Sequence, residues 1–156
     1  MSASPTERLR ELGVSLPAPP QPAGTYSSVV TNNGYAWVSG QIVRRDGTVV
    51  HPGLVGRDVP PETAQEVARE AMLQALSALQ AALGSLDRIV RVVRVVVYVA
   101  SAPGFDQQHV VANGATEILV ALFGDRGRPA RAAIGVAVLP LNAPVEVEVQ
   151  VAIAEG

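Results

Sequence analysis

Residues Arg131 to Ala154, RAAIGVAVLPLNAPVEVEVQVAIA, contain the most regular pattern in the chain. In the second half, from Val145 onward, apolar residues alternate with polar or small ones. A period of two is typical of a β-strand with one buried face. Pro140 and Pro144 bracket the segment between the halves, where a missing backbone N–H does no harm. The stretch therefore predicts two strands joined by a short loop, as a final hairpin.

Two charged residues of this stretch are candidates for chemistry. Arg131 opens the first strand, and its guanidinium could offer a planar fork to a carboxylate. Glu146 lies on the polar face of the second strand. From the residues alone, Arg131 is equally an ordinary surface ion-pair residue, and Glu146 an exposed carboxylate like Glu148. The two lie far apart along the expected hairpin, so a site between subunits would be needed to unite them.

The rest of the chain predicts an α+β domain. Expected strands cover residues 25–31, 35–40, 42–45, 48–51 and 89–100, and helical spacing predicts helices over 62–83 and 106–123. Two helices and about six strands suggest a mixed sheet with both helices on one face. The second face would then be apolar and uncovered, which a lone domain would not leave wet.

The first 23 residues are expected to form a separate segment, followed by a single domain over residues 24–156. A short helix over residues 5–13 could be capped by Thr6 and ended by Gly13. The following segment, LPAPPQPAG, is too rich in proline for helix or central strand. Either this proline-rich arm lies on the domain or it is a mobile tail, and the sequence does not decide between them.

Composition excludes several kinds of chemistry. The chain of 156 residues has no Cys, so it has no disulfide and no thiolate nucleophile. It also has no Lys, which removes Schiff-base chemistry and the P-loop lysine. Neither of the two histidines, His51 and His109, has metal-ligand spacing around it. A net charge of −2 gives no general attraction to nucleic acid. Neither a signal peptide nor a membrane span is recognisable, so we expect a cytoplasmic protein. We also expect that it uses no metal and no cofactor.

Several motifs of the chain occur in the same order in one known family. At the C-terminal end these are Arg131, Leu139-Pro140 and Val145-Glu146-Val147-Glu148; upstream they are Gly24, Tyr26, Val38-Ser39-Gly40-Gln41, Gly84-Ser85-Leu86-Asp87, Asn113 and Phe123. In this set the chain resembles the RidA family (also called YjgF/YER057c/UK114), the reactive-intermediate deaminases. The resemblance implies a chorismate-mutase-like mixed sheet of six strands and a homotrimer with active sites in clefts between subunits.

The resemblance also implies roles for individual residues. Arg131 would grip a substrate carboxylate and Glu146 would position or activate a water. Tyr26 and Ser39 would line the pocket. Together with Asn113 and Ala133 they would bind the substrate. The chain departs from the family at Ala132, where Ser or Thr is common, and at Ala133, where Cys or a similar residue is placed. A main-chain N–H at Ala133 would still serve the carboxylate.

The function implied by the resemblance is hydrolytic deamination of enamines or imines derived from amino acids, giving a 2-keto acid and ammonia. The type substrates are 2-aminoacrylate and 2-iminopropionate. Two alternatives stay open at this point. One is a trimer that binds small carboxylates without turnover. The other is an endoribonuclease, which the near-neutral charge and the few aromatic residues disfavour.

Overall fold

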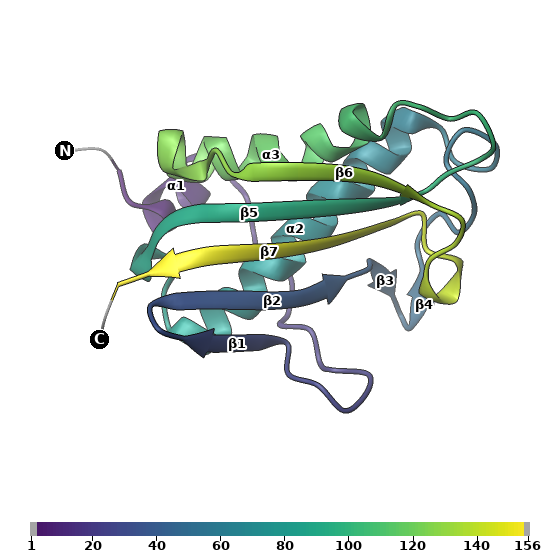
Figure 1. The fold of residues 1–156 in the computed structure, drawn as a ribbon. Coiled ribbons are helices and arrows are strands. Elements are labelled where there is room, and N and C mark those ends of the chain that lie inside the picture. The colour runs from purple at the N-terminus through teal and green to yellow at the C-terminus, as the bar shows by residue number, and fades with distance from the viewer. Residues whose placement is uncertain (1–2, 155–156) are drawn as a thin grey trace.

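The computed structural model describes residues 3–154 as a five-stranded sheet with helices packed on it. Figure 1 shows the strands in the order β1 (Val29–Asn32), β2 (Tyr35–Gln41), β7 (Val145–Ile153), β5 (Ile89–Ala100) and β6 (Ala130–Val136). Strands β3 (Arg44–Arg45) and β4 (Thr48–Val49) form a separate two-stranded sheet. The mixed α+β architecture is confirmed, with the expected six strands replaced by five plus this small hairpin.

The predicted final hairpin is wrong. Strand β6 pairs with β5 in parallel, and β7 pairs with the other edge of β5 in antiparallel, so β5 separates the two. Alternation along a strand fixes which face is buried but says nothing about which strand lies beside it. The run Val95–Val97 in β5 is buried, which suits a strand with neighbours on both sides.

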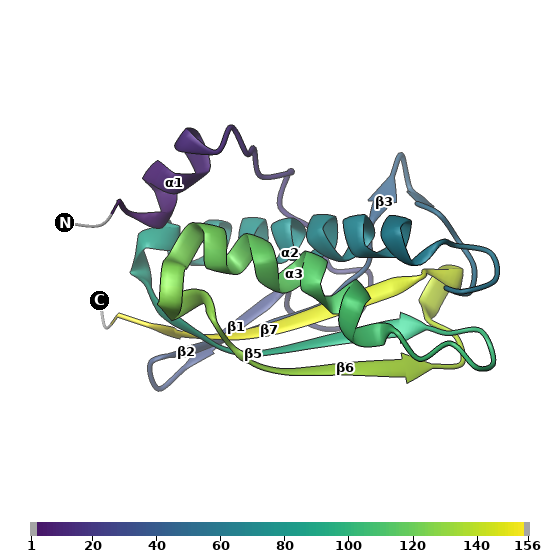
Figure 2. The same cartoon turned by 90° about the horizontal axis from the view of Figure 1, so that it is seen from above.

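Two long helices cover one face of the sheet, as predicted. Helix α2 (Pro61–Leu83) and helix α3 (Gln108–Phe123) lie side by side above the strands in Figure 2. The apolar side of β7 faces them, since Val147 and Val151 are fully buried. The two helices approach closely at Gly114, where an added Cβ would meet the backbone carbonyl oxygen of Gln65. None of the helices in residues 3–154 is long and apolar enough to cross a membrane.

Helix α1 (Pro5–Glu11) is present, but its cap is not the predicted one. Ser4 is the N-cap and forms a capping box with Glu7. Thr6 instead hydrogen-bonds through its backbone N–H and its hydroxyl to Oδ1 of Asp87, at 3.0 and 2.8 Å. These bonds tie α1 to the turn before β5.

The proline-rich arm lies on the domain, which decides between the two alternatives left open above. Three hydrogen bonds hold it. Ser77 of α2 donates to the carbonyl oxygen of Pro17 at 2.6 Å, and Ser28 donates to that of Pro20 at 3.3 Å. The backbone N–H of Ala23 donates to the hydroxyl of Tyr26 at 3.2 Å.

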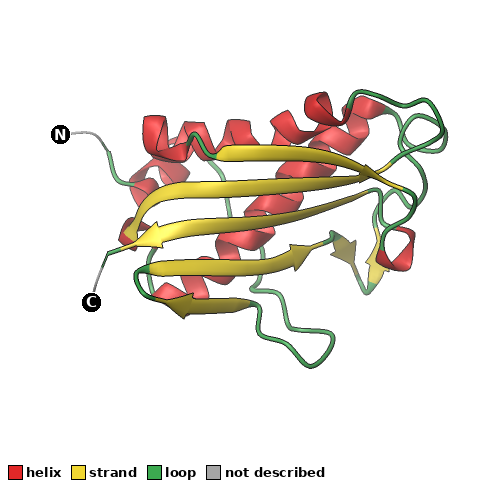
Figure 3. Cartoon of the chain, viewed as in Figure 1, coloured by secondary structure: helices red, strands yellow, loops and turns green. Residues whose placement is uncertain are grey.

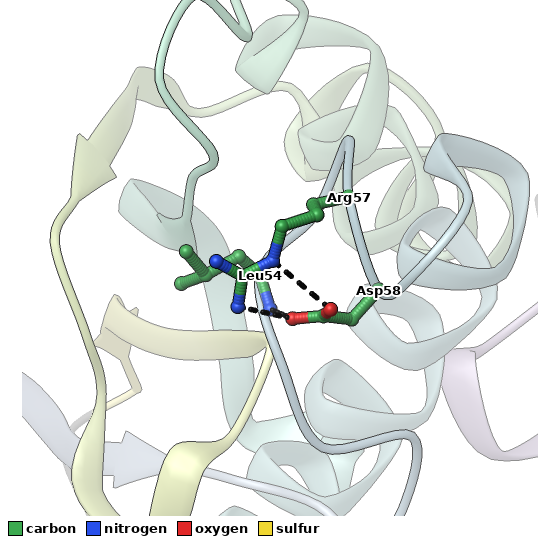
Figure 4. Close-up of polar contacts among 3 residues, drawn as sticks. All are labelled: Leu54, Arg57 and Asp58. Atoms are coloured by element: carbon green, nitrogen blue, oxygen red, sulfur yellow. Dashed lines mark hydrogen bonds and ion pairs between the residues drawn. The ribbon is translucent and has the colours of Figure 1, made fainter.

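Loops and short 3-10 helices join these elements, as Figure 3 shows. The 3-10 helices are η1 (Leu86–Arg88), η2 (Gly124–Gly127) and η3 (Pro140–Asn142). The loop before α2 is closed by Asp58, whose carboxylate accepts from the guanidinium of Arg57 and from the N–H of Leu54 at 2.9 Å (Figure 4). The hydrogen bond from Arg57 and that from Leu54 lower the pKa of Asp58. The pair is exposed and serves the shape of the loop.

Candidate functional site

A break in the strand pairing places Glu146 against Gly40. The register of β2 with β7 shifts between Val38 and Gln41, which is the position of a β-bulge. Gly40 lies in this bulge, and a Cβ added to it would collide with the Glu146 carboxyl. On its other side, in the register of β5 with β7, Glu146 lies opposite Tyr98. The absence of a side chain at Gly40 therefore makes the space that the Glu146 carboxyl occupies.

The environment of Glu146 raises its pKa. Partial burial disfavours the ionised carboxylate, and the nearby charge of Glu148 adds to the effect. Glu148 itself accepts a hydrogen bond from the Tyr98 hydroxyl at 3.1 Å. A carboxylate with a raised pKa is a better proton acceptor, which is a property expected of a general base.

Glu146 lines a pocket of about 310 Å³ beside the end of β2. The other walls come from the arm and Tyr26, the chain from the end of β2 to Arg44, Gln74 of α2, and the 3-10 helix η3 with Leu141. Leu141 has φ 56, and this left-handed backbone lies in the turn that leads into β7. The volume falls within the range of small-molecule sites, which is about 300–1,000 Å³.

Tyr26 lies in this pocket, whereas Ser39 does not. The Tyr26 ring is half exposed, and its hydroxyl accepts the bond from Ala23 that holds the arm. Ser39 lines a different hollow of about 210 Å³, together with Trp37 and Arg94. Its hydroxyl donates to the carbonyl oxygen of Ser27 at 2.6 Å. Of these two predicted pocket residues, the structure brings only Tyr26 to Glu146.

Arg131 and Asn113 contact each other at the opposite edge of the sheet. Nη1 of Arg131 donates to Oδ1 of Asn113 at 2.8 Å and to the Thr116 hydroxyl at 3.1 Å. Nη2 donates to the backbone carbonyl oxygen of His109 at 3.4 Å. These bonds to α3 fix the guanidinium. They leave Nε–H and one N–H of Nη2 without a partner among the described residues, so the guanidinium keeps donors for a carboxylate.

Within one protomer, Arg131 and Glu146 do not share a site. Arg131 lies beside Val95 in the register of β6 with β5, and Val95 is buried under the helices. Glu146 lies beside Tyr98 in the register of β7 with β5. Because side chains alternate along a strand and an odd number of positions separates Tyr98 from Val95, Glu146 is on the face opposite to Arg131. Ala133 pairs with Val97 and packs against the core on the helix side with Arg131.

The uncovered face of the sheet is more polar than predicted. Exposed apolar side chains are present at Tyr35, Trp37 and Ile134, and the Tyr35 and Trp37 rings lie 6.0 Å apart. Between them, however, the polar side of β7 presents Glu146 and Glu148. The face therefore combines an apolar border with a band of carboxylates.

Three pocket residues were missed by the sequence reasoning. Gln41 is buried, and its Oε1 accepts from Nε2 of Gln74 at 2.8 Å. Gln74 also donates to the carbonyl oxygen of Ile42 at 3.1 Å, which fixes the end of β2 against α2. Arg44 lines the same pocket as Glu146. Gln41 was within a recognised motif, but Gln74 and Arg44 carry no pattern that marks them as pocket residues.

Metal-binding side chains do not cluster in the described part of the chain. Within residues 3–154, no group of three His, Asp or Glu side chains is placed to hold an ion. The functional groups that line the pocket of Glu146 are its partly buried carboxyl, a phenol, a serine hydroxyl, three side-chain amides and a guanidinium.

Comparison with known proteins gives matches over most of the chain. A model of the family described as Endoribonuclease L-PSP matches residues 17–153. Protein TCP17 of Trypanosoma cruzi is 43% identical over 141 residues, which are 90% of this chain and 88% of that protein.

Solved structures give the same result. The protein Atu1372 of Agrobacterium tumefaciens, itself of unknown function, is 40% identical, with a TM-score of 0.87 over 96% of this chain and 92% of that chain. RidA from the Antarctic bacterium Psychrobacter is 28% identical, with a TM-score of 0.55 over 87% of this chain and 94% of that chain.

Proposed function

This chain belongs to the Endoribonuclease L-PSP family, which is the YjgF/RidA family, so the resemblance seen in its motifs is confirmed. From this membership and the pocket, we propose that the protein hydrolyses reactive imines or enamines of amino acids to 2-keto acids and ammonia. The observation that carries the proposal is the Glu146 carboxyl, which has a raised pKa and lies against Gly40 in a pocket that fits a small molecule.

Glu146 acts on water in the proposed reaction. The imine carbon is already electrophilic, so the step that needs help is the attack of water on it. Glu146 accepts a proton from the water as its oxygen bonds to the carbon. That proton goes to the nitrogen as the C=N double bond becomes single, which gives a carbinolamine. Glu146 then takes the proton of the new hydroxyl and passes it to the nitrogen, so that the C–N bond breaks, the C=O bond of the 2-keto acid forms and ammonia leaves. Proton transfer of this kind contributes roughly a hundred- to ten-thousandfold in rate, and the reaction needs no cofactor.

Arg131 of a neighbouring protomer supplies the carboxylate anchor in this proposal. The two residues lie on opposite faces in one chain, so the site needs a second copy. The bonds from Arg131 to Asn113 and Thr116 hold the guanidinium still, and its remaining N–H groups would bind the substrate carboxylate. A homotrimer with sites in its clefts provides this arrangement, with Tyr26 beside the reacting carbon. It also covers the exposed aromatic side chains of the sheet.

A coupled assay tests the proposal. An amino-acid oxidase or a PLP-dependent dehydratase generates the imine, and release of the 2-keto acid is followed with the wild type, Glu146→Gln and Arg131→Ala. Acceleration by the wild type that both substitutions abolish is the expected result. If the wild type gives no acceleration with several imines but binds 2-keto acids tightly, the protein is a carboxylate-binding module instead.

The family name raises one more activity to test. Incubation of the protein with a labelled single-stranded RNA is expected to leave the RNA intact, because the uncovered face of the sheet carries the Glu146 and Glu148 carboxylates. Cleavage that Glu146→Gln abolishes would replace the deaminase proposal.

A further inference from the structure

Arg44 is a guanidinium in the pocket that the proposed reaction does not use. It opens the short strand β3 and lines the pocket together with Glu146. The next residue, Arg45, binds both carboxylate oxygens of Glu70 on α2, at 2.9 and 2.8 Å. Consecutive side chains of a strand point to opposite sides, and Arg44 lines the pocket of Glu146 whereas Arg45 does not, although both arginines border a further hollow beside Glu70.

Arg44 has no protein partner among the residues that the structure describes. It forms neither an ion pair within 4.0 Å nor a side-chain hydrogen bond in residues 3–154, although Glu146 lines the same pocket. The pocket is therefore lined by a partly buried carboxyl and by a guanidinium that does not pair with it. The Arg44 guanidinium can bind an anion there.

The space around Arg44 extends beyond the pocket of Glu146. Two further hollows, of about 270 and 380 Å³, are also lined by both Arg44 and Gln74. The arm borders both of them, through Pro17 in one and Pro20 in the other. Arg44 therefore borders all three hollows, and it is a cation of the same pocket for a substrate that lies against Glu146 and is longer than three carbons.

The walls near Arg44 are held in place. The side-chain amide of Gln74 donates hydrogen bonds to Oε1 of Gln41 and to the carbonyl oxygen of Ile42. The carbonyl oxygens of Pro17 and Pro20 already accept from serine hydroxyls. The proline nitrogens of the arm have no hydrogen to donate. Arg44 is thus the cation of the Glu146 pocket that stays available to a ligand.

We propose that Arg44 binds a second anionic group at the far end of the substrate, so the preferred substrates are imines of amino acids with an acidic side chain. This inference rests on the proposed deaminase function, since it assigns the substrate class of the same site. Glu146 activates the water that attacks the imine carbon. Arg131 of the neighbouring protomer binds the first carboxylate, and Arg44 binds the second.

The test compares two imines made by amino-acid oxidases, one from glutamate and one from norvaline, which has a neutral side chain. The wild type is expected to have the higher kcat/KM with the glutamate imine. In Arg44→Ala the ratio of the two kcat/KM values falls roughly ten- to a hundredfold, as for the loss of a hydrogen bond to a charged group. Arg44→Lys keeps part of the preference. Arg45→Ala removes the same charge from the adjacent residue and keeps the full preference.

Two results would overturn the assignment of Arg44. One is a wild type without preference for the glutamate imine, and the other is an equal loss with both imines in Arg44→Ala. If neither imine is turned over at all, the deaminase proposal fails. The role of Arg44 is then tested separately, by calorimetric measurement of the affinities of the wild type and Arg44→Ala for the two 2-keto acids. Tighter binding of 2-oxoglutarate than of 2-oxopentanoate, lost in Arg44→Ala, would support the second anion site. Equal affinities would refute it.

Discussion

Arg131 and Glu146 lie on opposite faces of the same sheet, with β5 between their strands. Arg131 faces α3 and is held there by Asn113 and Thr116, while Glu146 faces away from the helices and into the bulge at Gly40. A single protomer therefore cannot bring both side chains to one small substrate.

Gly40→Ala is expected to disable the Glu146 carboxyl while leaving the fold intact. The new Cβ would overlap the carboxyl, which must then swing away from its position. We expect kcat to fall roughly a hundredfold, because a misplacement of about 1 Å at a catalytic group has that cost. Gly40 does not have a positive φ, so the free energy of unfolding in urea is expected to change by less than about 1 kcal/mol.

A double variant provides the control for this substitution. If Gly40→Ala acts through Glu146, then adding it to Glu146→Gln causes no further loss of kcat. Additive losses would mean that the bulge serves catalysis in some other way.

Glu146→Gln is expected to stabilise the protein at neutral pH. The folded state raises the pKa of Glu146 through burial and through Glu148, so the wild type loses stability as the pH rises through that pKa. Glutamine has no charge to bury, so the variant escapes this loss. The difference in free energy of unfolding should vanish below the ordinary pKa of a glutamate and reach its full value at neutral pH.

The exposed Glu117 on α3 supplies the matched control for this titration. Glu117→Gln makes the same chemical change at an exposed helix position, so the two variants are unfolded side by side across the same pH range. A Glu146→Gln variant whose stability differs from that of the wild type by the same amount at every pH would contradict the raised pKa of Glu146.

Ser77→Ala is expected to loosen the arm. The Ser77 hydroxyl is buried and donates to the carbonyl oxygen of Pro17, which would lose its partner. Loss of this hydrogen bond costs about 0.5–1.5 kcal/mol, which urea unfolding measures. Proteolysis within the arm should also become faster than in Ser27→Ala, which removes a hydroxyl from an exposed residue. Equal rates in the two variants would mean that the bond to Pro17 does not hold the arm.

Gly114→Ala is expected to destabilise the fold even though alanine is the better helix former. Its Cβ would meet the backbone carbonyl oxygen of Gln65, which cannot rotate away as a side chain could. Overpacking of this kind costs about 1–3 kcal/mol. The exposed position Glu117 on the same helix should tolerate alanine, and a Gly114→Ala variant as stable as the wild type would disprove the close contact of α2 and α3.

Local pattern was sufficient for most of the fold. The period of two in β7, the period of the α2 helix and the turn at Asn33-Gly34 all depend on near neighbours in the chain, and each is found where the pattern predicts it. Strand partners depend on distant segments, so no local pattern could show that β5 separates β6 from β7. The choice of Ser4 over Thr6 as helix cap was missed because Thr6 bonds instead to Asp87, which is remote in sequence.

Those residues of the candidate site that belong to recognisable sequence motifs could be predicted. Tyr26 and Glu146 were identified from the motifs and do line one pocket. Arg44 and Gln74 were missed because their place in the pocket depends on how β3 and α2 pack against the end of β2. No local spacing encodes that packing.

The central claim is that one site is built from Glu146 of one protomer and Arg131 of its neighbour. The most direct measurement mixes the inactive variants Arg131→Ala and Glu146→Gln, dissociates them and lets them reassemble before the imine assay. Each mixed contact can pair an intact Arg131 with an intact Glu146, so about one quarter of the sites in a random mixture should recover wild-type activity. A mixture as inactive as the separate variants would contradict the account.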